Sequence, residues 1–111
     1  MITSMPVDVN NNPVPALRLR SGKAHTISAG ASAAKNASAF ADDTQIVSVY
    51  ASVPVYIAFG DSSVSASSSD HYFPAGVYYD FAIGNEHSGH QTYLSVLQVS
   101  SAGTVYVSEK Y

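Results

Sequence analysis

The chain has 111 residues, of which 46% are hydrophobic, and this is enough for one core and one domain but not for two. The net charge is −3 with only five Lys and Arg, which argues against a nucleic-acid-binding protein, because phosphate backbones select for clustered basic residues. Only 12% of the residues are charged and there is no Cys, so disulfides and thiolate metal sites are excluded.

The first residues do not have the pattern of a secretory signal, because Met1–Pro6 lacks a basic region followed by an apolar run. No stretch approaches the roughly 20 apolar residues needed to cross a bilayer. We therefore expect synthesis in a cytoplasm and no membrane partner.

Residues 1–20 are predicted to form an extended N-terminal arm, followed by a single domain over residues 21–111. Pro6, Pro13 and Pro15 exclude a helix and disfavour a central strand in this region. The end of the arm alternates between apolar and basic side chains, so it is either a first strand or the docking end of the arm. The four residues at this end are Leu17, Arg18, Leu19 and Arg20.

The segments that follow the arm differ in how clearly the sequence predicts a strand. Ala24–Ile27 suits a short strand, whereas Ala29–Phe40 stays ambiguous, because its alanines favour a helix while its Gly, Ser and Asn residues favour a loop or strand. Thr44–Tyr50 has apolar residues on both faces, which is typical of a central strand.

The second half alternates more regularly. Val53–Phe59 and Val77–Ile83 each place apolar residues on one face, as in strands that are half buried. Leu94–Val99 and Val105–Val107, joined by a loop that contains Gly, are predicted to form a hairpin. Ser62–Ser69 is a small polar segment that suits either a mobile loop or one that becomes ordered against a neighbour.

Six or seven short strands at spacings of roughly 8 to 12 residues predict an all-β fold, either a small antiparallel β-sandwich or a jelly-roll-like barrel. No Cys is available to hold such a small domain together. The domain must therefore be held by its core or by partners, and oligomerisation is the natural supplement.

Candidate metal ligands occur in one predicted loop, where His87 and His90 are three residues apart and Glu86 is nearby. A zinc site needs three or four convergent ligands, and no third ligand stands at a recognisable spacing. Polar residues are also what a loop between two strands requires, so we expect neither a metal nor another cofactor.

Catalysis is not expected either. A triad can be arranged on paper from one of the many serines, a histidine (His71, His87 or His90) and Asp61 or Asp70, but the abundance of these residues makes that match uninformative. No Gly-x-Ser-x-Gly motif, phosphate-binding loop or dinucleotide fingerprint occurs in the sequence. The sequence therefore predicts a protein that is not an enzyme.

Eight tyrosines are an unusual number for a chain of this length. Outward-facing tyrosines supply large contact areas at low entropic cost and are enriched in interfaces, so Tyr56, Tyr78 and Tyr106 are candidate exposed interface residues. Ordinary strand propensity and cross-strand packing explain the same residues equally well.

The strand and turn motifs of the second half resemble small β-sandwich virion proteins of tailed bacteriophages, of the head decoration or cement type. The residues that carry this resemblance are Tyr56–Asp61, Asp70, Phe73–Val77, Phe81 and Gly103–Glu109. They cover about half of the chain, and the first half, including the proline-rich arm, does not contribute to them.

The resemblance implies a structural virion protein on the capsid surface, made in the host bacterial cytoplasm. Such a protein binds the outside of the phage head and stabilises contacts between subunits of the major capsid protein. On this reading the end of the arm, Leu17 to Arg20, is the candidate capsid contact, with apolar anchors at Leu17 and Leu19 and partners for acidic capsid residues at Arg18 and Arg20. It also implies self-association, with a homotrimer favoured, since closed symmetry covers sheet edges. Two alternatives remain open: a receptor- or glycan-binding module of a tail or head spike that uses the His87–His90 loop and tyrosines, and a small metal-dependent enzyme.

Overall fold

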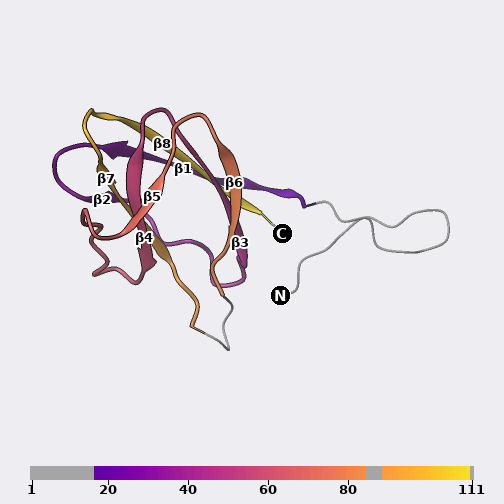
Figure 1. The fold of residues 1–111 in the computed structure, drawn as a ribbon. Coiled ribbons are helices and arrows are strands. Elements are labelled where there is room, and N and C mark those ends of the chain that lie inside the picture. Colours follow the sequence, from indigo (N-terminus) through magenta and orange to yellow (C-terminus); the bar gives the residue numbers. More distant parts are fainter. Residues whose placement is uncertain (1–16, 85–88, 111) are drawn as a thin grey trace.

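The fold consists of strands alone in the part of the chain that the computed structural model describes, residues 17–84 and 89–110. Two antiparallel sheets of four strands each pack face to face, and no helix occurs among the described residues (Figure 1). The strands are β1 (Leu19–Ala29), β2 (Ala34–Lys35), β3 (Ile46–Ala51), β4 (Val55–Gly60), β5 (His71–Phe73), β6 (Tyr78–Ala82), β7 (Tyr93–Gln98) and β8 (Gly103–Lys110). The all-β prediction is confirmed, while residues 1–16 of the predicted arm lie outside the described residues.

The strand order identifies the architecture. The first sheet runs β1-β8-β3-β6 and the second sheet runs β2-β7-β4-β5. Strands therefore pair from the two ends of the chain inward, β1 with β8, β2 with β7, β3 with β6 and β4 with β5, which is the arrangement of a jelly roll. The edges of the first sheet are β1 and β6, and those of the second sheet are β2 and β5.

The core lies between the sheets and follows the period-two alternation of each strand. In β3, Val47 and Val49 are fully buried while Tyr50 faces outward, and in β8 Val105 and Val107 are buried while Tyr106 faces outward. The central position predicted for β3 is confirmed, because β3 lies between β8 and β6. β3 also contributes Ala51, other strands add Ile27, Ala29, Val55, Ile57, Phe73, Leu94 and Val96 to the core, and Phe40 and Ile83 complete it.

The predicted hairpin of Leu94–Val99 with Val105–Val107 is wrong. β7 pairs with β2 and β4 in the second sheet, whereas β8 pairs with β1 and β3 in the first sheet. The connection after β7 therefore crosses from one sheet to the other. Gly103, at the start of β8, allows the Val53 side chain to pack close to the backbone. A Cβ at position 103 would lie 2.5 Å from Val53 Cγ2.

Replacement of Gly103 by alanine is expected to lower the free energy of unfolding by about 1–3 kcal/mol, because Val53 must move to admit the added methyl group. Chemical denaturation followed by tyrosine fluorescence measures the change. Gly30→Ala is the matched control, since a Cβ at Gly30 meets nothing within 4 Å. Equal stability of the two variants would contradict this explanation of Gly103.

The serine-rich loop is anchored on the outer face of the second sheet. Ala66 is buried, and its N–H donates a hydrogen bond to Ser95 Oγ on β7 at 2.9 Å. Asp61 and Asp70 accept hydrogen bonds from Ser63 and Ser67 and so stabilise the turns at each end of the loop. The hydrogen bonds from Ser63 also lower the pKa of Asp61. The loop therefore covers part of the second sheet.

A buried carboxylate links β8 and β1 to the loop before β3. Glu109 occupies an inward position of β8 and is fully buried. Its carboxylate accepts hydrogen bonds from His25 Nε2 (2.6 Å), the backbone N–H of Ala41 (2.9 Å) and Thr44 Oγ1 (2.6 Å). Burial alone raises the pKa of Glu109, but these hydrogen bonds outweigh it and the pKa is lowered.

Candidate interaction surface

Three tyrosines lie side by side across the outer face of the first sheet. Tyr50 on β3 is directly opposite Tyr78 on β6 and, on its other side, Tyr106 on β8. They are 37%, 56% and 50% exposed, and the rings of Tyr50 and Tyr106 are 6.4 Å apart between centroids. We call Tyr50, Tyr78 and Tyr106 the tyrosine row. It presents large aromatic area with hydroxyl groups, which suits contact with a protein surface.

One member of the tyrosine row is fixed by polar neighbours on the same face. The Ser48 hydroxyl donates a hydrogen bond to Tyr78 Oη at 2.6 Å, and Lys110 Nζ lies 4.9 Å from the centre of the Tyr78 ring. Lys110 also forms an ion pair with Asp80 at 2.9 Å. Burial alone lowers the pKa of Lys110, but the hydrogen bond and charge of Asp80 outweigh it and the pKa is raised. Tyr78 is therefore held in place before any partner binds.

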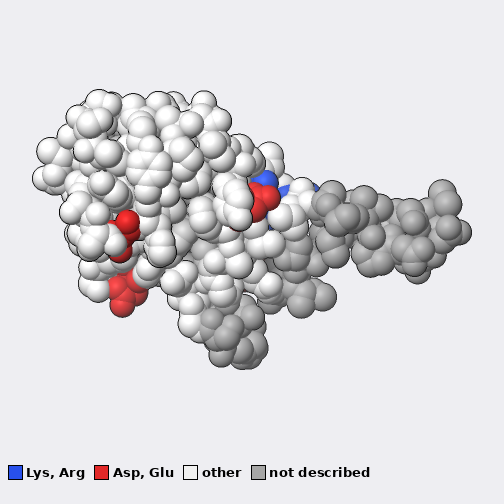
Figure 2. Space-filling view, viewed as in Figure 1, with Lys and Arg blue, Asp and Glu red and all other residues white. Residues whose placement is uncertain are grey.

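Charges are sparse over much of the molecule. On the side seen in Figure 2, Lys, Arg, Asp and Glu occupy only small parts of the surface. Burial of an aromatic face with few charges against a partner removes few hydrated charges from water, so the desolvation cost of such a contact is low.

Two of these three residues, Tyr78 and Tyr106, were predicted from the sequence as exposed interface residues, together with Tyr56. Tyr56 is half-buried on β4 of the second sheet, where it lies opposite Tyr72, with 6.4 Å between ring centroids. Tyr56 therefore belongs to the opposite face of the sandwich. Tyr50 was not predicted as an interface residue. Because Val47 and Val49 face inward and side chains alternate along a strand, the sequence already indicated that Tyr50 faces outward.

The candidate arm residues divide between β1 and the segment before it. Leu19 and Arg20 belong to β1, and Leu19 is opposite Lys110 of β8 and largely exposed. Arg20 forms an ion pair with Asp43 at 3.0 Å, which fastens the start of β1 to the loop before β3. Leu17 is half-buried and Arg18 is exposed. The last residues of the predicted arm are thus anchored at the edge of the first sheet.

The histidines do not converge on one site in the part of the chain that is described. His25 bonds Glu109, His90 Nε2 lies 2.6 Å from the carbonyl oxygen of Thr44, and His71 lies on β5. His87 and Glu86 of the predicted loop lie outside the described residues. Within residues 17–84 and 89–110, no group of three or more His, Asp or Glu side chains is placed to hold a metal ion.

No helix long and apolar enough to cross a membrane occurs in the described ranges.

Comparisons with protein-family models, with curated proteins and with solved structures found no match to this chain.

Proposed function

We propose that this protein is a structural virion protein that decorates the outside of a phage head. It binds the major capsid protein through the tyrosine row and stabilises contacts between capsid subunits. It acts as a homo-oligomer, with a trimer favoured, at the capsid surface after synthesis in the host bacterial cytoplasm. The tyrosine row is the observation that carries this proposal, because it is an exposed, sparsely charged, partly preorganised aromatic face on a rigid sheet.

Two further observations support the choice of this face. The serine-rich loop already covers part of the outer face of the second sheet, through Ala66 and Ser95, so the first sheet offers the larger open aromatic area. The half-buried Leu17 and the exposed Arg18 stand just before β1, at the edge of the first sheet. An arm that continues from them can contact a capsid subunit next to the one bound by the tyrosine row.

Co-sedimentation of the purified full chain with shells of its cognate major capsid protein, and in parallel with host cells, tests the proposal. We expect saturable binding to shells and none to cells. Binding to cells or to isolated surface glycans, without shell binding, would replace this proposal with the receptor- or glycan-binding module. No binding to either would contradict both.

A further inference from the structure

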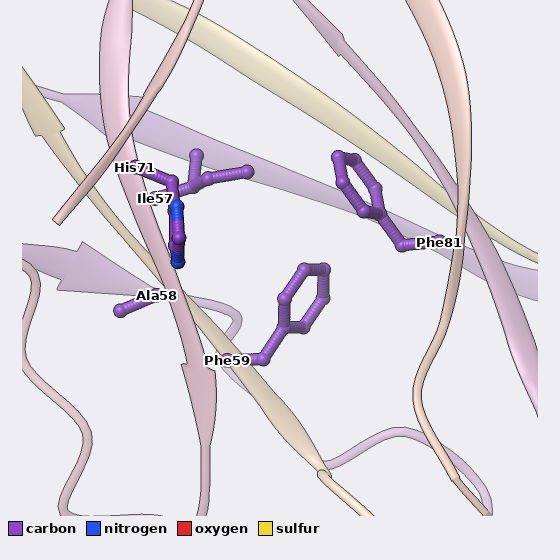
Figure 3. Close-up of a pocket in the computed structure, with 5 residues that line it drawn as sticks. All are labelled: Ile57, Ala58, Phe59, His71 and Phe81. Atoms are coloured by element: carbon purple, nitrogen blue, oxygen red, sulfur yellow. The ribbon is translucent and has the colours of Figure 1, made fainter.

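A partly open pocket of about 280 Å³ lies where the two sheets separate, between β4 and β5 of the second sheet and β6 of the first sheet. It is lined by Ile57, Ala58, Phe59, His71 and Phe81. Phe59 and Phe81 extend toward each other from the two sheets, and the His71 ring lies beside Ile57 and Ala58 (Figure 3). The tyrosine row does not contribute to this pocket, so the pocket is a separate candidate site.

The inner face of β6 beside the pocket is only partly covered. Tyr79 and Phe81 are opposite the fully buried Val49 and Val47 of β3, so both occupy inward positions of the first sheet. Tyr79 is nevertheless 56% exposed, and Phe81 is half-buried. On the other side of the pocket, β5 has only three residues, which is too short to cover β6 along its length. Aromatic side chains at inward positions are therefore accessible to a ligand.

The rings around the pocket favour an aromatic ligand. The ring centroids of Phe59 and Phe81 are 5.4 Å apart and the ring planes are tilted by 53°, while Tyr79 and Phe81 are 5.0 Å apart and tilted by 61°. Tilted rings present both faces and edges, and aromatic pairs in this geometry gain stabilisation beyond that of the buried area. A flat aromatic ring therefore matches this lining better than an aliphatic group of the same size.

The volume of the pocket is sufficient for a whole small molecule. An apolar cavity of about 150 Å³ is large enough to bind benzene, and this pocket has about 280 Å³. It can therefore hold a complete substituted ring, whereas one aromatic side chain of a protein partner would leave part of it empty.

His71 is the single polar side chain among the residues that line the pocket. It is opposite the buried Ile57, so it lies on the inner face of the second sheet and diagonal to Phe59. A neutral imidazole donates a hydrogen bond through one nitrogen and accepts one at the other. A hydroxyl group also does both, whereas an anion would meet no Lys or Arg in the lining. The polar group that best fits His71 is therefore a hydroxyl group.

We propose that this pocket binds a small phenolic molecule, with its aromatic ring against Phe59 and Phe81 and its hydroxyl group hydrogen-bonded to His71. Phe59 and His71 are diagonal neighbours on one face of the second sheet, so one substituted ring can contact both side chains. The site is separate from the tyrosine row, and ligand binding here does not depend on a capsid partner.

Titration of the full-length protein with phenol, followed through its amide resonances by heteronuclear NMR, tests the site. We expect saturable shifts that include the amides of Phe59, His71 and Phe81. Cyclohexanol and toluene are the matched ligands, because each has the size of phenol but lacks either the aromatic ring or the hydroxyl group. We expect phenol to bind at least about fivefold more tightly than either of them. Equal affinity for phenol and cyclohexanol, or for phenol and toluene, would overturn the assignment to a phenol.

Replacement of His71 tests the position of the hydroxyl group. His71→Ala is expected to weaken phenol binding about fivefold, the effect of one hydrogen bond, and to change toluene binding far less. Tyr72→Ala is the matched control, because Tyr72 is the next residue of β5, is 58% exposed and points to the opposite face of the sheet. We expect this variant to bind phenol as the wild type does. Equal losses of phenol affinity in the two variants would overturn the role of His71.

A peptide with a single tyrosine distinguishes a free ligand from a protein partner. A blocked Ala-Tyr-Ala peptide presents the same phenol ring on a backbone, and we expect it to bind more weakly than phenol. Tighter binding of the peptide at the pocket would assign the site to a protein partner and overturn the small-molecule proposal. Absence of saturable shifts with phenol up to its solubility would overturn the site itself. All of these titrations use protein without shells, so their outcome is independent of the shell-binding test of decoration.

Discussion

Replacement of Glu109 by alanine is expected to lower the free energy of unfolding by about 3 kcal/mol or more, because it removes a buried carboxylate that three donors share. The variant leaves the donors of His25, Ala41 and Thr44 without their common acceptor inside the protein. Urea denaturation at pH 7 measures the loss. Glu109→Gln is the matched comparison, because it keeps the shape and one acceptor oxygen, and we expect it to lose roughly half as much.

The same carboxylate makes the stability depend on pH in a defined direction. The pKa of Glu109 in the folded protein lies below its usual value of 4.5, so the unfolded chain takes up a proton first as the pH falls. The stabilisation by Glu109 is therefore complete above pH 4.5 and is lost as the pH falls from there through the lowered pKa. Glu109→Gln should lack this part of the acid dependence. Parallel pH profiles for the wild type and Glu109→Gln would contradict the assigned role of the buried carboxylate.

Simultaneous replacement of Tyr50, Tyr78 and Tyr106 by threonine is expected to weaken shell binding at least about 100-fold, because each aromatic anchor of an interface contributes about a factor of ten or more. Threonine is a good strand former, so the fold and the core behind these outward positions should persist. Titration of shells with labelled protein measures the affinity, and circular dichroism checks the fold.

Single variants give a matched control for the tyrosine row. Tyr106→Thr and Tyr72→Thr remove tyrosines of similar exposure, 50% and 58%, from opposite faces of the sandwich. Only Tyr106→Thr should reduce shell binding. An equal loss for Tyr72→Thr would mean that binding does not depend on the outer face of the first sheet.

Strand periodicity predicted the fold class and much of the core, because alternation along one strand is a local property. Val105 and Val107 read inward and Tyr106 outward from the sequence, and the structure agrees. The same alternation places Glu109 on the inward side of β8, so its burial was readable from the sequence. A charged residue at an inward position indicates a buried polar network, and Glu109 is the centre of one.

Pairing between strands could not be read in the same way, because it depends on which segments meet in space. The period of β7 and β8 does not reveal that they belong to different sheets, and Gly103 suits a hairpin loop as well as a close approach to Val53. The tyrosine row could not be predicted in full for the same reason, because it depends on which strands are neighbours. Tyr50 joins Tyr78 to Tyr106 only because β3 lies between β6 and β8.

A reconstruction by electron cryomicroscopy of shells saturated with this protein tests the central proposal most directly. We predict that the domain sits on the outer shell surface with β8, β3 and β6 facing the capsid and Tyr50 within the contact. Binding through the Tyr56 and Tyr72 face would contradict the assignment of the tyrosine row. Shells without added density at saturating protein would contradict decoration itself.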